Sequence, residues 1–133
     1  KTNCIVIDFG TATTFDIVKN GIYYGGVIAP GIKLSLETLV NKAEQIPIFS
    51  LKKTHNVIGK NTVSALRAGF FWGYAGLINN IIKLIKKEAK CQFKIILTGG
   101  YSYLFNKSLK FKVLIDKDIT IKGLIEILRL KKF

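Results

Sequence analysis

Hydrophobic residues near the start of the chain occur in short, nearly continuous runs, at 5–7, 15–18 and 22–28. Runs of this length that are rich in β-branched and aromatic residues are typical of strands. Gly10 separates the first two runs, and Asn20-Gly21 separates the second from the third. Asn-Gly is a strong signal for a tight hairpin turn. The pattern therefore predicts three consecutive antiparallel strands.

After Pro30-Gly31 the hydrophobic residues recur mainly at spacings of three and four, which predicts helices. A first helix is expected from Ile32 to Val40 or beyond, with Pro47 as its limit, and a long helix from Thr62 to Lys87. The rest of the chain predicts, in order, a strand at 94–98, a short helix at 102–105, a strand at 111–115 and an amphipathic helix at 119–130 that is capped by Asp118 or Thr120.

This order of elements predicts an α/β or α+β fold in a single domain, residues 1–133. The antiparallel hairpins come first and the helical crossovers later. We therefore expect a mixed sheet with an antiparallel three-strand start and helices packed on it in three layers. The chain contains neither an internal repeat nor a low-complexity linker.

The long predicted helix has two distinct faces. One carries large apolar residues and is expected to be buried: Val63, Leu66, Phe70, Tyr74, Leu77, Ile81 and Ile85. The other carries a small-residue stripe: Ala65, Gly69, Gly73 and Gly76. Because glycine inside a helix costs roughly 1 kcal/mol relative to alanine, we expect close approach of another backbone as compensation. That backbone belongs either to the sheet or to a second subunit.

Charge and hydropathy narrow the function classes. The net charge is +13, all of the excess lies after residue 50, and 19 of the 21 basic residues are lysines. A basic half invites a nucleic-acid interpretation, but no lysine run is interleaved with aromatic residues for base stacking, so solvated helix faces are favoured. The longest uncharged stretch of the long helix has 15 residues, whereas a membrane span needs about 20. Neither nucleic acid nor a membrane is an expected partner.

Three further features bear on the origin of the chain. It contains no methionine and shows no signal-peptide pattern at its start. Its two cysteines, Cys4 and Cys91, stand without a second cysteine or a histidine at metal-ligand spacing. We expect a cytoplasmic chain with reduced thiols that is a fragment, or one half of a larger protein.

The candidate chemistry lies where the first strand ends, at Asp8-Phe9-Gly10-Thr11. Gly10 allows a tight turn with room for a ligand beside the backbone, Asp8 can hold a cation, and Thr11 can donate to phosphate oxygens. An Asx turn that merely caps a hairpin is the alternative. A second glycine pair, Gly99-Gly100, follows a strand, where a nucleotide base or sugar can lie against backbone.

Other reaction classes find no support. Gly59-Lys60-Asn61-Thr62 departs from a Walker A loop at Asn61, and the single histidine, His55, excludes most histidine-based catalysis. What remains is phosphate, cation and hydroxyl chemistry.

Six motifs taken together resemble one family, the second domain of type III pantothenate kinase, in the actin-like superfamily of ribonuclease-H-like domains. They are Asp8-Phe9-Gly10-Thr11-Ala12-Thr13-Thr14-Phe15-Asp16, Gly25-Gly26-Val27-Ile28-Ala29-Pro30-Gly31, Leu34-Ser35, Ile46-Pro47, Ile58-Gly59-Lys60-Asn61-Thr62 and Thr98-Gly99-Gly100, with Asp118 to Leu124 fitting the family's C-terminal segment. The resemblance covers essentially the whole chain. It implies phosphorylation of pantothenate from ATP, the first step of coenzyme A synthesis, by a homodimer that needs magnesium and a monovalent cation, potassium or ammonium.

The resemblance also implies roles for individual residues. Asp8 would bind the monovalent cation, Gly10 and Thr11 would contact the ATP phosphates, and Thr62 would contact pantothenate. Gly99 and Gly100 would border the adenosine.

The catalytic base of the family lies in an N-terminal domain that is absent from this chain. Asp16, Asp116 and Asp118 do not match its position, so the isolated chain is expected to be inactive. Two other functions stay open: a non-catalytic nucleotide-binding regulator, of the kind described as transcriptional accessory factors in this family, and another actin-like small-molecule kinase. The segment Ile58 to Thr62 favours pantothenate over the latter.

Overall fold

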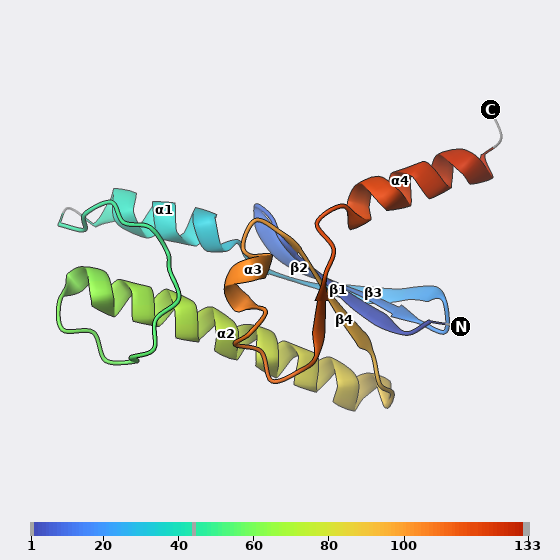
Figure 1. Cartoon of the computed structure of the whole chain (residues 1–133), viewed down its shortest axis with the longest axis horizontal. Coiled ribbons are helices and arrows are strands. Elements are labelled where there is room, and N and C mark those ends of the chain that lie inside the picture. The colour runs from blue at the N-terminus through green and yellow to red at the C-terminus, as the bar shows by residue number, and fades with distance from the viewer. Residues whose placement is uncertain (1, 44, 132–133) are drawn as a thin grey trace.

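The computed structural model describes residues 2–43 and 45–131. Five strands form one mixed sheet in the order β3-β2-β1-β4-β5 (Figure 1). Their bounds are β1 Cys4–Phe9, β2 Ala12–Lys19, β3 Ile22–Pro30, β4 Lys94–Gly99 and β5 Val113–Ile115. The first three strands pair antiparallel, and β4 and β5 join parallel to β1 and to each other. The predicted mixed sheet with an antiparallel three-strand start is confirmed.

Four helices connect or follow the strands: α1 Ile32–Lys42, α2 Thr62–Ala89, α3 Ser102–Phe105 and α4 Ile119–Leu130. The extension of α1 towards Pro47 is wrong, because the helix ends at Lys42 and Ala43 is already extended. The last predicted strand is also shorter, since β5 begins at Val113 and not at residue 111. No helix within the described residues is long and apolar enough to span a membrane.

The hairpin between β2 and β3 has the predicted turn chemistry. Asn20 and Gly21 both have positive φ, 55° and 79°, as a type I′ turn requires. The sequence did not predict the irregularity that follows, where the register shifts between Ile17 and Val18 and Tyr24 has no partner on β2. Such a β-bulge increases the local twist of the sheet edge.

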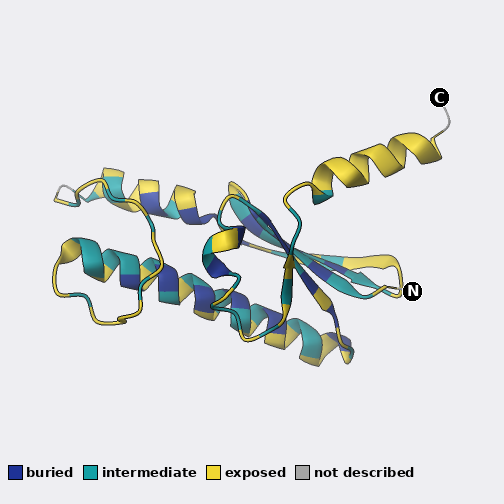
Figure 2. Cartoon of the chain, viewed as in Figure 1, coloured by how far each residue is buried: buried dark blue, intermediate teal, exposed yellow. Residues whose placement is uncertain are grey.

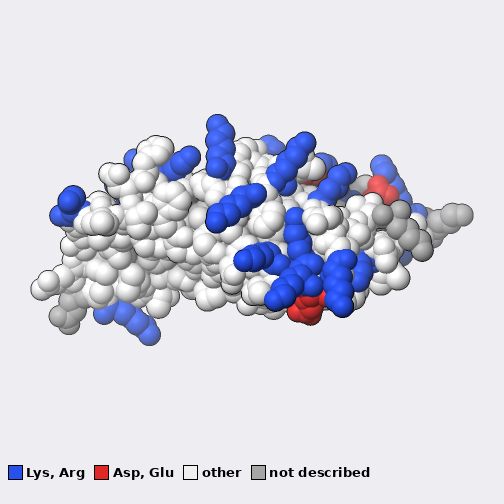
Figure 3. Space-filling view, turned by 90° about the horizontal axis from the view of Figure 1, so that it is seen from below, with Lys and Arg blue, Asp and Glu red and all other residues white. Residues whose placement is uncertain are grey.

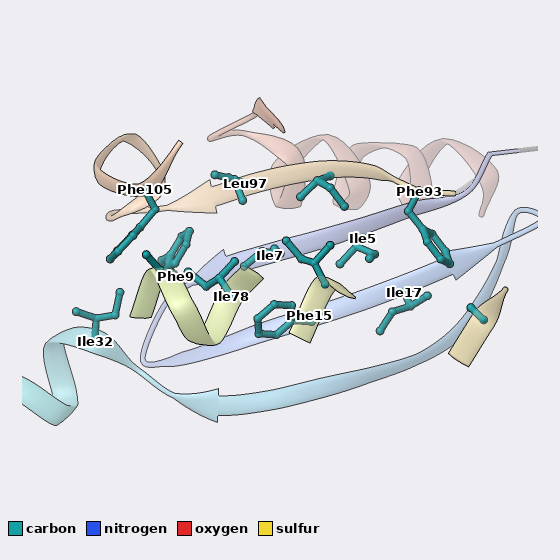
Figure 4. Close-up of a cluster of buried hydrophobic side chains, with 14 of the residues drawn as sticks. Ile5, Ile7, Phe9, Phe15, Ile17, Ile32, Ile78, Phe93, Leu97 and Phe105 are labelled. Carbon is teal, nitrogen blue, oxygen red and sulfur yellow. The ribbon is translucent and has the colours of Figure 1, made fainter. Parts of the chain in front are cut away.

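The core lies between α2 and one face of the sheet (Figure 4). Alternate residues of β1, namely Ile5, Ile7 and Phe9, are buried on this face. Phe105 of α3 stacks on Phe9 with ring centroids 5.5 Å apart, and at the same distance on Phe71 of α2. Burying an aromatic side chain of this size stabilises a fold by about 1.5–3 kcal/mol, so this stack joins three elements firmly at the end of β1.

The buried face of α2 differs from the predicted one. The predicted residues such as Phe70 are only half-buried, and the buried residues of α2 are Ala68, Phe71, Ala75, Ile78, Ile82 and Ala89. Apolar residues occupy so much of the circumference of α2 that their spacing alone does not locate the centre of contact. The position at which α2 crosses the sheet determines which of its apolar residues are buried.

The expectation of three layers, with helices packed on both faces of the sheet, is wrong for α4. Figure 1 shows that α4 leaves the body after β5, and no residue of this helix is buried (Figure 2). On the sheet face away from α2, the β1 residues Cys4, Val6 and Asp8 are only half-buried. Within the described part of the chain, the sheet is thus covered on one face.

Candidate functional site

Two strand ends meet where the sequence predicted chemistry. Because β1 and β4 are parallel neighbours, Asp8 lies opposite Thr98 and Phe9 lies opposite Gly99. The turn that carries Gly10 and Thr11 follows β1 directly. Asp8, Gly10, Thr11, Gly99 and Gly100 therefore gather at one edge of the sheet, the carboxyl end of its parallel strands, which is the usual ligand-binding edge of such sheets.

Gly99 is required by the geometry of this edge. Its φ is +87°, and a Cβ at this position would lie 2.7 Å from an Asp8 carboxylate oxygen and 2.7 Å from the Phe9 carbonyl oxygen. Only glycine keeps a left-handed backbone here without strain. The absence of a side chain leaves the carboxylate of Asp8 next to the backbone of β4.

The turn at Gly10 is less demanding than predicted. The φ of Gly10 lies outside the left-handed region, and a Cβ would make only ordinary contacts, 3.6 Å from the Ala12 carbonyl oxygen at the closest. Gly10 therefore makes the predicted tight turn without a backbone conformation that only glycine can adopt. Its N–H donates to that same carbonyl at 3.1 Å, so the exposed hydroxyl of Thr11 is the better candidate donor to a ligand.

Gly31, between β3 and α1, packs closely against the backbone of this turn. A Cβ on Gly31 would overlap the Thr11 carbonyl oxygen and approach that of Gly10 to 2.9 Å. Next to it, the Pro30 carbonyl accepts hydrogen bonds from the Thr13 hydroxyl at 3.0 Å and from the Tyr74 hydroxyl at 3.2 Å. The turn is thereby tied to α1 and α2. Sequence reasoning missed Tyr74 in this role, because its partners lie 43 or 44 residues away.

Thr62 lies elsewhere, as the first residue of α2. Asn61 caps the helix: its side-chain oxygen accepts from the Ser64 N–H at 2.9 Å, and the Ser64 hydroxyl accepts from the N–H of Asn61 at 3.1 Å. This capping box satisfies two otherwise unpaired donors. A Cβ on Gly59 would overlap the backbone of Ala65, so the segment before Thr62 is held closely against the helix.

A groove of about 800 Å³ runs between α1 and α2, with Thr62 at one end. The Tyr74 hydroxyl lies within hydrogen-bond distance, 3.1 Å, of the Ser35 hydroxyl on α1. Its lining is largely apolar and comes from three elements: Pro30, Ser35, Leu39, Thr62, Ala65, Leu66, Gly69, Phe70, Gly73, Tyr74 and Leu77. The structure does not bring Thr62 into the cluster at Asp8. Pro30, which also lines the groove, is adjacent to Gly31 at the junction of β3 and α1.

Ala65, Gly69 and Gly73 of the small-residue stripe line this groove, whereas Gly76 lines a separate hollow beside Asn79 and Phe111. Ala65, Gly69, Gly73 and Gly76 are all exposed, and no atom of another element lies within 4 Å of where a Cβ would stand on any of the three glycines. Burial of the stripe against the sheet is therefore excluded within the described chain. The alternative that the sequence left open, a contact with a second subunit, stays a prediction.

Two of the three aspartates that the sequence set aside, Asp16 and Asp116, are hydrogen-bonded to other side chains, and the third, Asp118, is the N-cap residue of α4. Asp16 accepts a hydrogen bond from the Tyr23 hydroxyl at 3.2 Å. The pKa of Tyr23 is raised, first by desolvation and then by the nearby negative charge of Asp16. Asp116 pairs with Lys122 at 2.8 Å, and this hydrogen bond holds the pKa of the Asp116 carboxyl below its ordinary value.

The residues around Asp8 supply only part of the coordination that a bound cation needs. Within residues 2–43 and 45–131, no group of three or more acidic, cysteine or histidine side chains could together hold a metal ion. Asp8 offers one carboxylate beside the backbone oxygen of Phe9. Such a set suits a monovalent cation or a magnesium ion only when ligand oxygens and water complete the coordination.

Basic side chains outnumber acidic ones on one face of the molecule. Figure 3 shows Lys and Arg side chains spread over the face seen from below, with few Asp or Glu side chains among them. On the C-terminal half of α2, Lys86 lies over the Phe111 ring at 4.4 Å. The lysine excess is thus exposed on the surface, as expected for solvated helix faces.

Comparison with known proteins shows which family this chain resembles. The family profile described as "Type III pantothenate kinase" matches residues 1–84. A type III pantothenate kinase of Pelagibacter ubique is 67% identical over 125 residues, which are 94% of this chain and 50% of that protein. One of Paramagnetospirillum magneticum is 48% identical over 130 residues, 97% of this chain and 50% of that protein. The chain spans about half the length of these curated relatives.

Two solved structures share the fold. A structure described as a Baf family transcriptional activator from Campylobacter jejuni is 26% identical, with a TM-score of 0.67 over 97% of this chain and 58% of that chain. An Alp12 filament structure is 20% identical, with a TM-score of 0.62 over 100% of this chain and 49% of that chain. These likenesses show a shared fold, in agreement with the predicted mixed sheet with helices packed on it.

Proposed function

This chain belongs to the type III pantothenate kinase family, and we propose that it supplies one half of a site in which ATP phosphorylates pantothenate. The γ-phosphoryl group of ATP is transferred to the pantothenate hydroxyl, which gives ADP and phosphopantothenate, the first step of coenzyme A synthesis. The observation that carries the proposal is the meeting of Asp8, Thr11 and Gly99 at one edge of the sheet. Asp8 and Thr11 lie within the segment that the family profile matches.

We assign the ATP contacts to this edge. The Thr11 hydroxyl and the backbone around Gly10 face the phosphates, and Gly99 and Gly100 border the adenosine, because neither glycine has a side chain to exclude it. Asp8 holds potassium or ammonium, and magnesium accompanies the nucleotide phosphates. Phosphoryl transfer depends mainly on positioning and on neutralising phosphate charge, which a carboxylate-held cation and a hydroxyl donor can assist.

Pantothenate is assigned to the neighbourhood of Thr62, at the end of the groove between α1 and α2. Ala65, Gly69 and Gly73 of the small-residue stripe line the same groove, and we propose the stripe as the contact between two copies in a homodimer. Glycines on an exposed helix face let a second backbone approach closely, and this offsets their cost in helix stability. The substrate site and the dimer contact would then share one surface.

The second half of the site is assigned to the additional length found in the relatives. A general base must lie within about 3 Å of the attacking hydroxyl. Asp16 and Asp116 are hydrogen-bonded to Tyr23 and Lys122, Asp118 is the N-cap residue of α4, and we assign the base to none of the three. We therefore expect the base, and the donors on the far side of the phosphates, in a further domain.

The test uses a full-length chimera, in which this chain replaces the matching 125 residues of the Pelagibacter ubique relative. We expect pantothenate-dependent ADP release from the chimera in a coupled assay. Thr62→Val should raise the pantothenate concentration needed for half-maximal rate more than the ATP concentration, while Thr54→Val, a threonine outside the groove, should change neither. A chimera that binds ATP but releases no ADP with pantothenate would refute the proposed reaction.

A second candidate is a nucleotide-binding regulator without catalysis. It is favoured by the likeness to the Campylobacter jejuni structure and by the basic face in Figure 3. Its signature is affinity for DNA that falls steeply as salt rises, because bound counterions are released. Tight, salt-sensitive DNA binding together with a chimera inactive on pantothenate would replace the kinase proposal with this one.

A further inference from the structure

The final helix, α4, presents an apolar face that nothing in the described chain covers. Leu124, Leu128 and Leu130 are 53%, 59% and 82% exposed, and Ile121, Ile125 and Ile127 are exposed as well. Five of these residues lie on one broad side of the helix, opposite Lys122, Glu126 and Arg129, with Leu130 outside this arc. Figure 2 shows the helix exposed along its length beyond the first turn. A stripe of this kind on a helix normally faces a core.

The direction in which α4 leaves the body is fixed by its first residues. The Asp116 N–H donates to the Leu97 carbonyl at 3.0 Å, which continues the pairing of β5 with β4. The Asp116 carboxylate accepts from the Asp118 N–H at 3.1 Å and pairs with Lys122 at 2.8 Å. Asp118 occupies the N-cap position, as predicted, but its side chain makes no capping hydrogen bond. The beginning of α4 is thus attached to the sheet through Asp116, while the apolar face of the helix is held away from the core.

A hollow of about 430 Å³ lies at this root, on the uncovered side of the sheet. Ile96 of β4, Leu114 of β5 and Tyr103 of α3 line it, together with the charged residues of the junction. Leu114 and Tyr103 are 50% and 66% exposed. The uncovered surface therefore continues from the sheet to the beginning of α4.

The size of the relatives indicates what covers this surface. The match to the Paramagnetospirillum magneticum protein takes in 130 of the 133 residues, so it includes most or all of α4. That protein has about as much chain again outside the match. The helix therefore belongs to proteins that contain a second region of similar size, which is large enough to form a domain with its own core.

The charges on α4 argue against a lipid surface. An amphipathic helix that lies on a membrane usually carries free Lys and Arg on its polar face. Here Lys122 is paired with Asp116, and Arg129 with Glu126 at 2.6 Å. The polar face consequently offers little free positive charge to anionic lipids.

We propose that α4 is the docking helix of this chain, and that its apolar face packs into the other half of the family protein. This inference shares one premise with the proposed function, namely that the other half of the family protein is present together with this chain. Leu124 and Leu128 supply the centre of the contact, and the hollow at Ile96 and Leu114 extends it onto the sheet. The ordered Asp116 junction presents the helix to its partner in a defined orientation.

The experiment measures amide hydrogen exchange of the 119–130 segment by mass spectrometry, in this chain alone and in the chimera defined above. We expect exchange in α4 to be slowed at least about tenfold in the chimera relative to the isolated chain. The double variant Leu124→Ala, Leu128→Ala should lose most of this protection in the chimera, because alanine maintains the helix but removes the contact. Leu84→Ala, an equally exposed leucine on α2 at 52%, should leave it unchanged.

Three results would overturn the proposal. Equal protection of α4 in the isolated chain would mean that this chain or a second copy of it covers the helix. Rapid exchange of α4 in a folded chimera would mean that the other half does not bind it. Protection that appears only with phosphatidylglycerol vesicles would assign the face to lipid. A chimera with protected α4 but no pantothenate-dependent ADP release would refute the proposed reaction and support the docking.

Discussion

At the residue scale, the candidate site depends on a few positions where one side chain, or the lack of one, decides the chemistry. Asp8 is the one carboxylate among the described residues that lies at the shared end of β1 and β4, beside Gly99. If it holds a monovalent cation, removing its charge should affect the cation before it affects the fold, because Asp8 is only half-buried.

We therefore expect Asp8→Asn in the chimera to abolish most of the stimulation of ATP binding by potassium. Isothermal titration in potassium chloride and in tetramethylammonium chloride would measure it. Asp16→Asn is the matched control, because Asp16 is engaged with Tyr23 and should leave the stimulation intact. A mutant that still responds fully to potassium would exclude Asp8 as the ligand.

Gly99 and Gly10 make a second test at this scale. Gly99→Ala forces a side chain onto a backbone with φ of +87° and against the Phe9 carbonyl oxygen, and we expect it to lower the free energy of unfolding by about 1–3 kcal/mol. Gly10→Ala should change it by less than about 1 kcal/mol, because its Cβ meets only ordinary contacts. Urea unfolding of both variants measures the difference, and equal losses would contradict the assignment.

At the element scale, α2 carries two different surfaces, one packed on the sheet and one lining the groove. Phe71 and Ile78 pack on the sheet, whereas Gly69 and Gly73 open onto the groove shared with α1. The half-buried residues between them, Phe70 and Tyr74, join the two. This division explains why large residues alone did not locate the buried face.

If the small-residue stripe is a dimer contact, a large side chain should disrupt association without harming the fold. We expect Gly73→Leu to shift the protein towards monomer by light scattering, with unchanged or slightly higher thermal stability, because leucine favours helix more than glycine does. Gly73→Ala keeps the stripe small and should remain dimeric. A Gly73→Leu protein with the mass of the wild type would rule out this contact.

The junction of β5 and α4 should respond to acid. Because the hydrogen bond from Lys122 lowers the pKa of Asp116, the stabilisation is present above the unfolded-state value of about 4 and is lost as pH falls through the lower folded value. The Asp116 pKa, followed by nuclear magnetic resonance, should rise in Lys122→Met. Arg129→Met, which breaks the separate pair with Glu126, should leave it unchanged. An identical Asp116 pKa in wild type and Lys122→Met would show that the pair does not form in solution.

At the scale of the whole molecule, the described residues leave several surfaces uncovered. Within residues 2–43 and 45–131, one sheet face is covered and the other is bare, and α4 extends away from the core. A single hairpin can approach the phosphates from one side only, whereas phosphoryl transfer needs them positioned from both.

We therefore expect the isolated chain to bind ATP weakly but to transfer no phosphate to pantothenate. Equilibrium binding and the coupled ADP-release assay, run on the isolated chain and on the chimera, measure the two activities separately. Pantothenate-dependent turnover by the isolated chain would mean that its catalytic base lies among the residues described here.

Some of this architecture follows from the sequence alone. The strands at 5–7 and 15–18, the Asn20-Gly21 turn and the long helix after Asn61 were predicted from spacing and turn chemistry, because these are properties of neighbouring residues. The motifs at Asp8 and Gly99 were also located by sequence. That they meet is a consequence of parallel pairing between β1 and β4, which the sequence analysis did not predict.

Tertiary structure decided the features that depend on contacts between distant residues. It placed the strained backbone at Gly99 and not at Gly10, because only Gly99 lies against the neighbouring strand. It selected which apolar line of α2 is buried, since the helix offers more than one and the sheet covers one. It also left α4 uncovered: amphipathic spacing predicts that a helix has a face to bury, but the partner that buries it is fixed only by the three-dimensional arrangement of the whole protein.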